Sequence, residues 1–120
     1  MSDESIHVYL KVGVPAERKS GFETIMHELV SEAQQEPGTL IYEWFFCDEG
    51  RTCHIQERYA NAVEGDKHVK NFAENFAGRF FEHIDGIEGV VSANASPYIR
   101  SVLDGISPTY AAKAAGFNRF

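Results

Sequence analysis

Apolar residues in this sequence switch between the two-residue period of a strand and the three-to-four-residue period of a helix, and the order of the switches leaves few folds open. Alternation over residues 6–14 predicts a first strand. A helix is predicted to begin at Ser20, which forms the S-x-x-E capping pattern with Glu23, and to end before Pro37. Its predicted inner face is the stripe Phe22, Ile25, Met26, Leu29, Val30 and Ala33.

Two segments rich in β-branched and aromatic residues, 39–47 and 52–59, come next. They predict a hairpin, because Gly50 between them suits a tight turn. A second helix is predicted from a cap at Asn61 to about Glu82. Its inward stripe is expected to be His68, Val69, Phe72, Phe76 and Phe80.

The C-terminal part of the chain predicts three further elements. A glycine-interrupted strand is expected around residues 90–95. Ser96 and Pro97 are typical of the cap and the first turn of a short helix, which should end near Leu103. We expect residues 108–120 to form an edge strand or an arm.

The resulting order, β-α-β-β-α-β, is the split βαβ pattern of the ferredoxin-like α+β sandwich. It predicts a four-stranded antiparallel sheet with two helices on one face. A chain of 120 residues has room for one domain, with a core over about 6–95 and a short helix and arm over 96–120. Segment 39–47 has large apolar side chains on both faces, so the face without helices also needs cover. A second copy of the chain is the expected cover, which makes the protein a homodimer.

Charge and composition exclude several classes of partner. The net charge is −7 and Lys and Arg do not cluster, so nucleic acid is not expected as a partner. The sequence contains no run of about 20 apolar residues and starts with polar residues, which favours a cytoplasmic protein without a membrane span. The histidines lack metal-site spacing, so no metal is expected. Cys47 and Cys53 lack CxxC spacing and are expected as reduced thiols, although pairing across the turn stays open.

The hairpin register decides which side chains share a face. With Glu49 and Gly50 as a two-residue loop, Glu57 falls on an otherwise apolar face. A buried carboxylate needs a partner, and the hydroxyl of Tyr42 or a ring nitrogen of His68 is expected beside it. Glu57 and His68 are therefore the candidate catalytic residues, as proton acceptor and general base. The alternative is that both are satisfied structural residues.

Aromatic residues gather around this carboxylate in the predicted arrangement. They could line a slot for a planar aromatic ligand, or they could be plain core. The candidate substrate-binding residues are Tyr42, Trp44, Tyr59, Phe72 and Phe76.

Three short motifs together resemble the signature of antibiotic biosynthesis monooxygenase domains, which belong to the dimeric α/β-barrel superfamily. They are the run E-P-G-T-L-I-Y-E at 36–43, the run Q-E-R-Y at 56–59, and His68 on the second helix. The resemblance implies a homodimeric α/β barrel with a pocket between helices and sheet. It matches Glu57, Tyr59 and His68 to signature positions, with Tyr42 beside them, and Tyr59 stands where the family has Trp.

The resemblance also implies an activity, which is oxygenation of hydroquinones or polycyclic aromatics with O2 and without a cofactor. We take a monooxygenase acting on a quinol-like aromatic molecule as the first hypothesis. The alternative is a non-catalytic dimeric protein that binds a small molecule or serves in a stress response, so whether the chain is an enzyme stays open. A haem-degrading role ranks lower, because the chain lacks a convincing equivalent of the Asn, Trp and His set of that branch.

Overall fold

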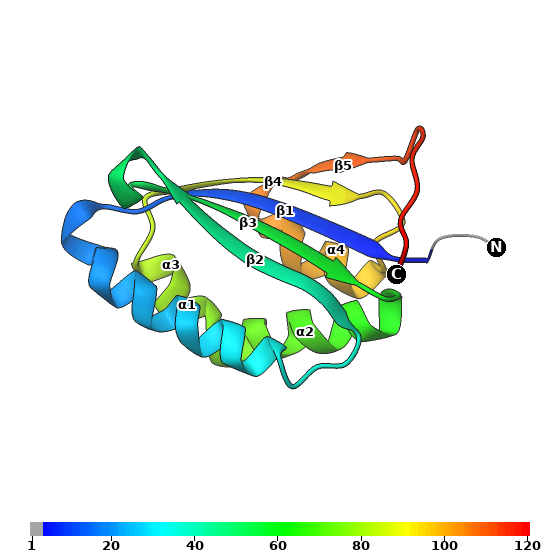
Figure 1. Ribbon diagram of the computed structural model, residues 1–120, viewed down its shortest axis with the longest axis horizontal. Coiled ribbons are helices and arrows are strands. Elements are labelled where there is room, and N and C mark those ends of the chain that lie inside the picture. The colour runs from blue at the N-terminus through cyan, green and yellow to red at the C-terminus, as the bar shows by residue number, and fades with distance from the viewer. Residues whose placement is uncertain (1–3) are drawn as a thin grey trace.

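The structure is a computed structural model that describes residues 4–120. It contains one mixed sheet with helices packed against it (Figure 1). The elements, in chain order, are β1 (Ile6–Gly13), α1 (Lys19–Ala33), β2 (Thr39–Cys47), β3 (Thr52–Tyr59), α2 (Ala62–Asn75), α3 (Ala77–Glu82), β4 (Gly86–Ser92), α4 (Pro97–Leu103) and β5 (Thr109–Ala111).

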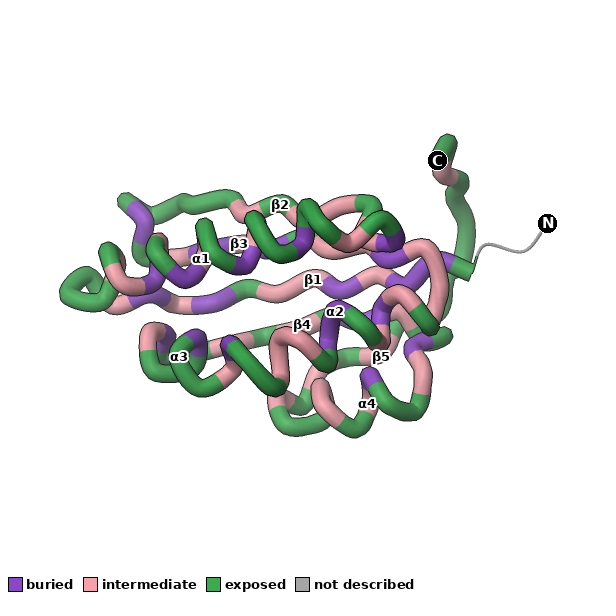
Figure 2. The backbone as a smooth tube through the Cα atoms, turned by 90° about the horizontal axis from the view of Figure 1, so that it is seen from below, coloured by how far each residue is buried: buried purple, intermediate pink, exposed green. Residues whose placement is uncertain are grey.

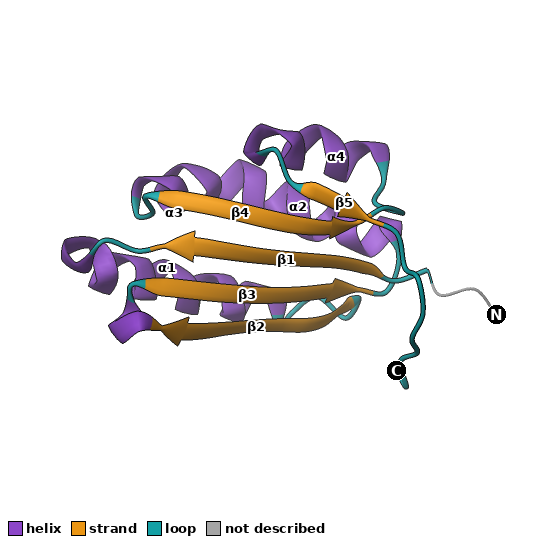
Figure 3. Ribbon diagram, turned by 90° about the horizontal axis from the view of Figure 1, so that it is seen from above, coloured by secondary structure: helices purple, strands orange, loops and turns teal. Residues whose placement is uncertain are grey.

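The sheet has the strand order β2-β3-β1-β4-β5, and all neighbouring strands are antiparallel except β4 and β5. Figure 3 shows the helices together behind the sheet, so one face of the sheet is left without helices, and we call it the open face. The predicted ferredoxin-like α+β fold is confirmed. The sheet, however, has a fifth strand, because residues 109–111 pair in parallel with β4.

The core lies between the covered face of the sheet and the inner faces of the helices, where buried segments face the strands (Figure 2). The predicted stripe of the first helix is confirmed at Phe22, Ile25, Leu29 and Ala33, all of which are buried. A second buried cluster joins Ile6 and Val8 of β1, Tyr59 of β3 and Ile99 of α4. The short helix α4 thus completes the core at one end of the sheet.

The hairpin register is confirmed. Tyr42 pairs with Glu57 and Trp44 pairs with Ile55, as a two-residue loop requires. The turn is a 3-10 segment (Asp48–Gly50) in which all three residues have positive φ, a conformation that favours glycine at Gly50. The pairing shifts between Thr39 and Ile41, so Leu40 sits at a bulge and is exposed, although its parity with Tyr42 suggested the inner face.

Several element boundaries were wrong. The first helix begins at Lys19 after a 3-10 turn (Ala16–Arg18), and Ser20 lies inside it rather than capping it. The second helix is broken at Phe76, whose φ is −129°, and the chain continues as the separate helix α3.

The last predicted strand was also misplaced, because β4 runs over Gly86–Ser92 rather than 90–95. Glycine is disfavoured in strands, and here Gly89 is needed for a close approach. A Cβ at this position would lie 3.1 Å from Ile106 and 3.2 Å from Leu10. The absence of a side chain therefore lets the chain after α4 pack directly on the strand.

The two cysteines lie on different faces of the sheet, since Cys47 pairs with Thr52 while Cys53 pairs with Phe46. Both are free thiols. Burial raises the pKa of the Cys53 thiol to about 12. Within residues 4–120, no helix combines the length and the apolar character that crossing a membrane requires.

Candidate active site

The carboxyl group of Glu57 lies on the covered face of the sheet, where β3 is paired on both sides. Glu57 is opposite Tyr42 of β2 and Val8 of β1, and its side chain is only 9% exposed. Tyr59 is two residues further along the strand and therefore on the same face. Its hydroxyl donates a hydrogen bond to Oε1 of Glu57. The hydroxyl that reaches Glu57 is thus that of Tyr59 rather than that of Tyr42.

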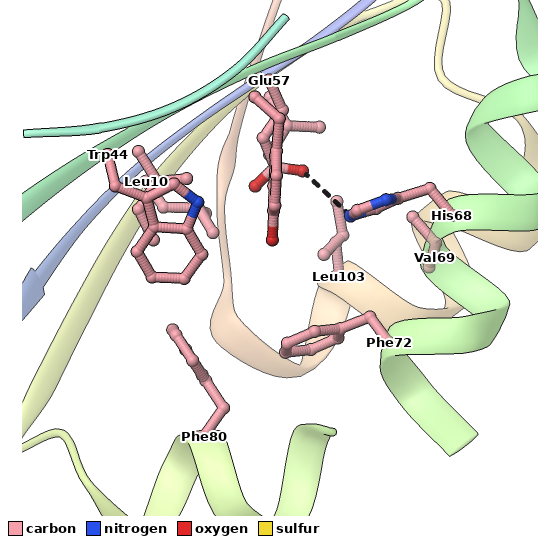
Figure 4. Close-up of a pocket in the computed structure, with 11 residues that line it drawn as sticks. Leu10, Trp44, Glu57, His68, Val69, Phe72, Phe80 and Leu103 are labelled. Atoms are coloured by element: carbon pink, nitrogen blue, oxygen red, sulfur yellow. Dashed lines mark ion pairs between the residues drawn. The ribbon is translucent and has the colours of Figure 1, made fainter. Parts of the chain in front are cut away.

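His68 faces Glu57 from α2. The imidazole is buried, and its Nε2 lies 3.8 Å from Oε1 of Glu57 (Figure 4). Two features of the sequence put it there. The side chain of Asn61 accepts a hydrogen bond from the backbone N–H of Glu64 at 3.0 Å and so starts the helix directly after β3. Gly65 lets the helix approach the sheet closely, because a Cβ there would meet Tyr59 at 3.5 Å and Ile99 at 3.0 Å.

Glu36, in the loop between α1 and β2, holds the other side of the imidazole. Its Oε1 lies 2.8 Å from Nδ1 of His68 and accepts a hydrogen bond from the hydroxyl of Thr39, also at 2.8 Å. The His68 ring therefore lies between two carboxyl groups, one on each nitrogen.

The pKa values of the two carboxyl groups are shifted in opposite directions. Burial raises the pKa of Glu57, and the neighbouring His68 and the hydroxyl of Tyr59 oppose that rise only in part. Burial also acts on Glu36, but the hydrogen bonds from His68 and Thr39 and the charge of His68 outweigh it and lower the pKa of this carboxyl. Burial, followed by the charge of Glu57, raises the pKa of the Tyr42 and Tyr59 hydroxyls well above 10.0, so both are neutral at physiological pH.

These protonation states determine what the group can do. Glu36 is an anion at neutral pH and accepts the Nδ1–H of His68, so Nε2 is the nitrogen of this ring that can take up a proton. That nitrogen faces Glu57, whose carboxyl keeps its proton to a higher pH than usual. The site therefore offers an oxygen and a nitrogen, 3.8 Å apart, either of which can take a proton from a bound molecule.

A pocket opens beside this pair, between the covered face of the sheet, α2 and the end of α4. The space available to the centres of water molecules is about 40 Å³, which is enough for a few waters. Apart from Glu57 and His68 its lining is mostly apolar, as is usual for small-molecule sites. The residues that line it are Val8, Leu10, Tyr42, Trp44, Ile55, Glu57, His68, Val69, Phe72, Phe80 and Leu103.

The predicted substrate-binding residues divide into two groups. Tyr42, Trp44 and Phe72 line the pocket together with the candidate catalytic residues. Tyr59 and Phe76 do not. Tyr59 is fully buried behind Glu57, and its ring packs on His68 at 5.0 Å. Phe76 lies at the helix break, in the core and beneath the guanidinium of Arg79. Fewer aromatic residues from the predicted set therefore line the pocket than the sequence suggested.

Sequence reasoning missed Glu36, Phe80 and Leu103 as parts of the site. Phe80 stood on the predicted stripe but was not expected to reach the pocket, and Leu103 lies at the end of a helix to which no role was assigned. Glu36 is the first residue of the E-P-G-T-L-I-Y-E run at 36–43, but the sequence alone did not indicate its contact with His68. Among residues 4–120, no group of three or more His, Cys, Asp or Glu side chains is arranged to hold a metal ion.

Comparisons with known proteins match the fold. Neither a family model nor a curated protein matches the sequence. Among solved structures, MupZ from Pseudomonas fluorescens has a TM-score of 0.78 and 20% identity, over 97% of this chain and 95% of that one. A candidate antibiotic biosynthesis monooxygenase from Nitrosomonas europaea has a TM-score of 0.66 and 11% identity, over 76% of this chain and 90% of that one.

A further candidate monooxygenase of this kind, from Caulobacter crescentus, has a TM-score of 0.64 and 20% identity, over 72% of this chain and 88% of that one. The structural neighbours of the chain are thus proteins of the antibiotic biosynthesis monooxygenase fold. At these identities the likeness is one of fold.

Proposed function

We propose that this protein is an enzyme in which Glu57 and His68 accept a proton from a small, largely apolar molecule. The reaction that we put first is the oxidation by O2 of a quinol-like or polycyclic aromatic substrate, without metal or flavin. The observation that carries the proposal is that a carboxyl with a raised pKa and the basic nitrogen of an imidazole line one apolar pocket. Structural neighbours described as candidate monooxygenases support the choice of reaction.

The chain's own residues have a limited task in such a reaction. Glu57 or Nε2 of His68 takes the proton of a substrate hydroxyl, and Glu36 keeps the imidazole oriented throughout. The substrate anion then gives an electron to O2. One oxygen atom enters the substrate and the other leaves as water, with all electrons supplied by the substrate. The apolar lining excludes bulk water and so protects the reactive anion.

The volume of the pocket limits how the substrate can enter. A space of about 40 Å³ for water centres is too small for a bicyclic ring, so side chains have to move before such a molecule can bind. Phe72 is only partly buried and Leu103 lies at the end of a short helix, so these two are best placed to move.

Oxygen uptake with a panel of hydroquinones tests the proposal. His68→Ala and Glu57→Gln should each abolish uptake that wild type shows. Glu32→Gln is the matched control, because Glu32 is an exposed carboxylate on α1 whose Oε1 only accepts a surface hydrogen bond from Asn71. Equal rates in all four proteins would exclude Glu57 and His68 from the chemistry.

The second candidate function is a non-catalytic binding protein, and the small volume of the pocket favours it. In that case Glu57, Tyr59 and His68 only satisfy one another. Binding of an aromatic molecule with no turnover under air, at any pH tested, would support this function over the first.

We propose further that the protein is a homodimer joined through its open face. Phe45 and Val90 point out from that face and are 49% and 43% exposed. Tyr9 of β1 and His54 of β3 lie between them in the sheet, and aromatic and apolar side chains together are typical of interface cores. A second copy would bury all of these side chains without disturbing the pocket on the covered face.

A further inference from the structure

Trp44 is the only tryptophan of the chain, and its ring is fixed at one wall of the pocket. Three aromatic rings surround it, with centroid distances of 5.7 Å to Phe22, 5.6 Å to Tyr42 and 6.2 Å to Phe80. The orientation of the indole is therefore determined by packing, and its N–H group points in a set direction.

That N–H group forms no hydrogen bond of normal geometry with the described residues. Nε1 of Trp44 is buried and unsatisfied among residues 4–120. It approaches the hydroxyl of Tyr42 without forming a hydrogen bond of normal geometry. Figure 4 shows the nitrogen on the side of the indole that faces Glu57 and His68. Buried donors are nearly always paired, so an unpaired donor that faces a pocket indicates a missing acceptor.

We propose that Trp44 Nε1–H donates a hydrogen bond to an oxygen atom of the bound molecule. This inference rests on the proposed function, in which an acidic hydroxyl of the same molecule meets Glu57 and His68. The ligand then carries two oxygen functions, an O–H that gives its proton to the pair and a second, accepting oxygen that lies against the indole.

The charge of the site limits which chemical group can supply the second, accepting oxygen. Glu36 is an anion and Glu57 is a second carboxyl beside the same imidazole. None of the described residues that line the pocket is Lys or Arg, so a carboxylate or phosphate at the indole would be repelled rather than bound. A neutral acceptor, such as a ketone, a phenol or an ether oxygen, fits instead.

Two probes that differ by one oxygen test the inference under nitrogen, namely 1,4-dihydroxynaphthalene and 1-naphthol. Because the chain has one tryptophan, its ¹H–¹⁵N spectrum contains one indole resonance. We expect that resonance to move downfield with 1,4-dihydroxynaphthalene and not with 1-naphthol. Wild type should bind the first about tenfold more tightly than the second, which is the size of one net hydrogen bond.

Trp44→Phe should remove that preference while leaving the binding of 1-naphthol nearly unchanged. Tyr42→Phe is the companion variant, and it should keep the preference. Loss of the preference in Tyr42→Phe but not in Trp44→Phe would assign the contact to the tyrosine and overturn the inference.

Two further outcomes separate the inference from the proposed function. Equal binding of both probes with an unmoved indole resonance, in a protein that still consumes oxygen, would overturn the inference alone. Absence of both binding and oxygen uptake would overturn the proposed function and the inference with it.

Discussion

Oε1 of Glu36 lies 2.8 Å from Nδ1 of His68, although the two residues are 32 positions apart in the chain. This contact sets the orientation of the imidazole, because Thr39 holds the same carboxylate oxygen from the other side. It also sets the tautomer, since an anionic acceptor at Nδ1 leaves Nε2 to face Glu57.

Replacing Glu36 by Gln should therefore slow oxygen uptake without abolishing it. The amide oxygen can still accept from Nδ1–H, but a neutral acceptor binds more weakly than a charged one, so we expect a loss of about five- to tenfold. The ¹⁵N spectrum of the His68 ring should also show a mixture of tautomers. Glu32→Gln, on the surface of the same helix–loop segment, should change neither readout. An unchanged rate and an unchanged tautomer in Glu36→Gln would show that the contact is only structural.

The raised pKa of Glu57 makes a prediction about stability and pH. Because burial raises the pKa in the folded state above its ordinary value of 4.5, the contribution of this group is fully present below pH 4.5 and is lost as the pH rises through the folded-state pKa. Wild type should therefore lose free energy of unfolding relative to Glu57→Gln as the pH increases. Urea unfolding of both proteins from about pH 4 to about pH 8 measures the difference. A difference that stays constant with pH would contradict the burial of an ionisable group here.

Glu36 should behave in the opposite sense. Its pKa is lowered in the folded state, so its stabilising contribution is present above pH 4.5 and is lost as the pH falls through the folded-state pKa. Wild type should thus gain free energy of unfolding relative to Glu36→Gln as the pH rises from the acid side toward neutrality. A urea series with this variant that is extended down to about pH 2 gives the measurement. A slope of the same sign as for Glu57→Gln would show that folding does not shift the pKa values of the two carboxyls in opposite directions.

The site residues that the sequence predicted correctly lie on strands and helices. The two-residue loop fixed the parity of β3 and so the face of Glu57, and the cap at Asn61 fixed the phase of the helix and so the inward direction of His68. Glu36 could not be found in this way, because it lies in a loop where no period relates a residue to a face. Its contact with His68 depends on how the loop folds back over the end of the helix.

The errors in the fold have a similar cause. The three-residue strand β5 is too short to show alternation, and it pairs in parallel with β4 through a crossover that contains α4. The break at Phe76 was hidden because Phe72, Phe76 and Phe80 keep the spacing of a continuous helix. That break moved Phe76 from the predicted slot into the core, so a local deviation of the backbone removed one residue from the expected site.

Phe72→Ala should enlarge the pocket at a cost in stability. The ring is partly buried, so we expect the free energy of unfolding to fall by about 2 kcal/mol, below the range for a fully buried Phe. Affinity for 1-naphthol under nitrogen should rise, because the wall that limits the pocket is removed. Phe81→Ala is the control, since Phe81 packs on Phe72 and Phe80 but does not line the pocket. Equal or weaker binding by Phe72→Ala would show that this side chain is not what restricts entry.

A pair of matched valines tests the proposed dimer. Val90 points out from the open face, whereas Val63 is 62% exposed on α2, on the helical side of the molecule. A carboxylate at position 90 would be buried without a partner in a sheet-on-sheet interface, so Val90→Asp should shift the protein from dimer to monomer in sedimentation velocity. Val63→Asp makes the same chemical change outside the proposed interface and should leave the dimer intact. Since the pocket lies on the other face of the sheet, a monomeric Val90→Asp protein that still binds 1-naphthol would show that the site is complete within one chain. Dissociation by Val63→Asp instead would place the interface on the helices.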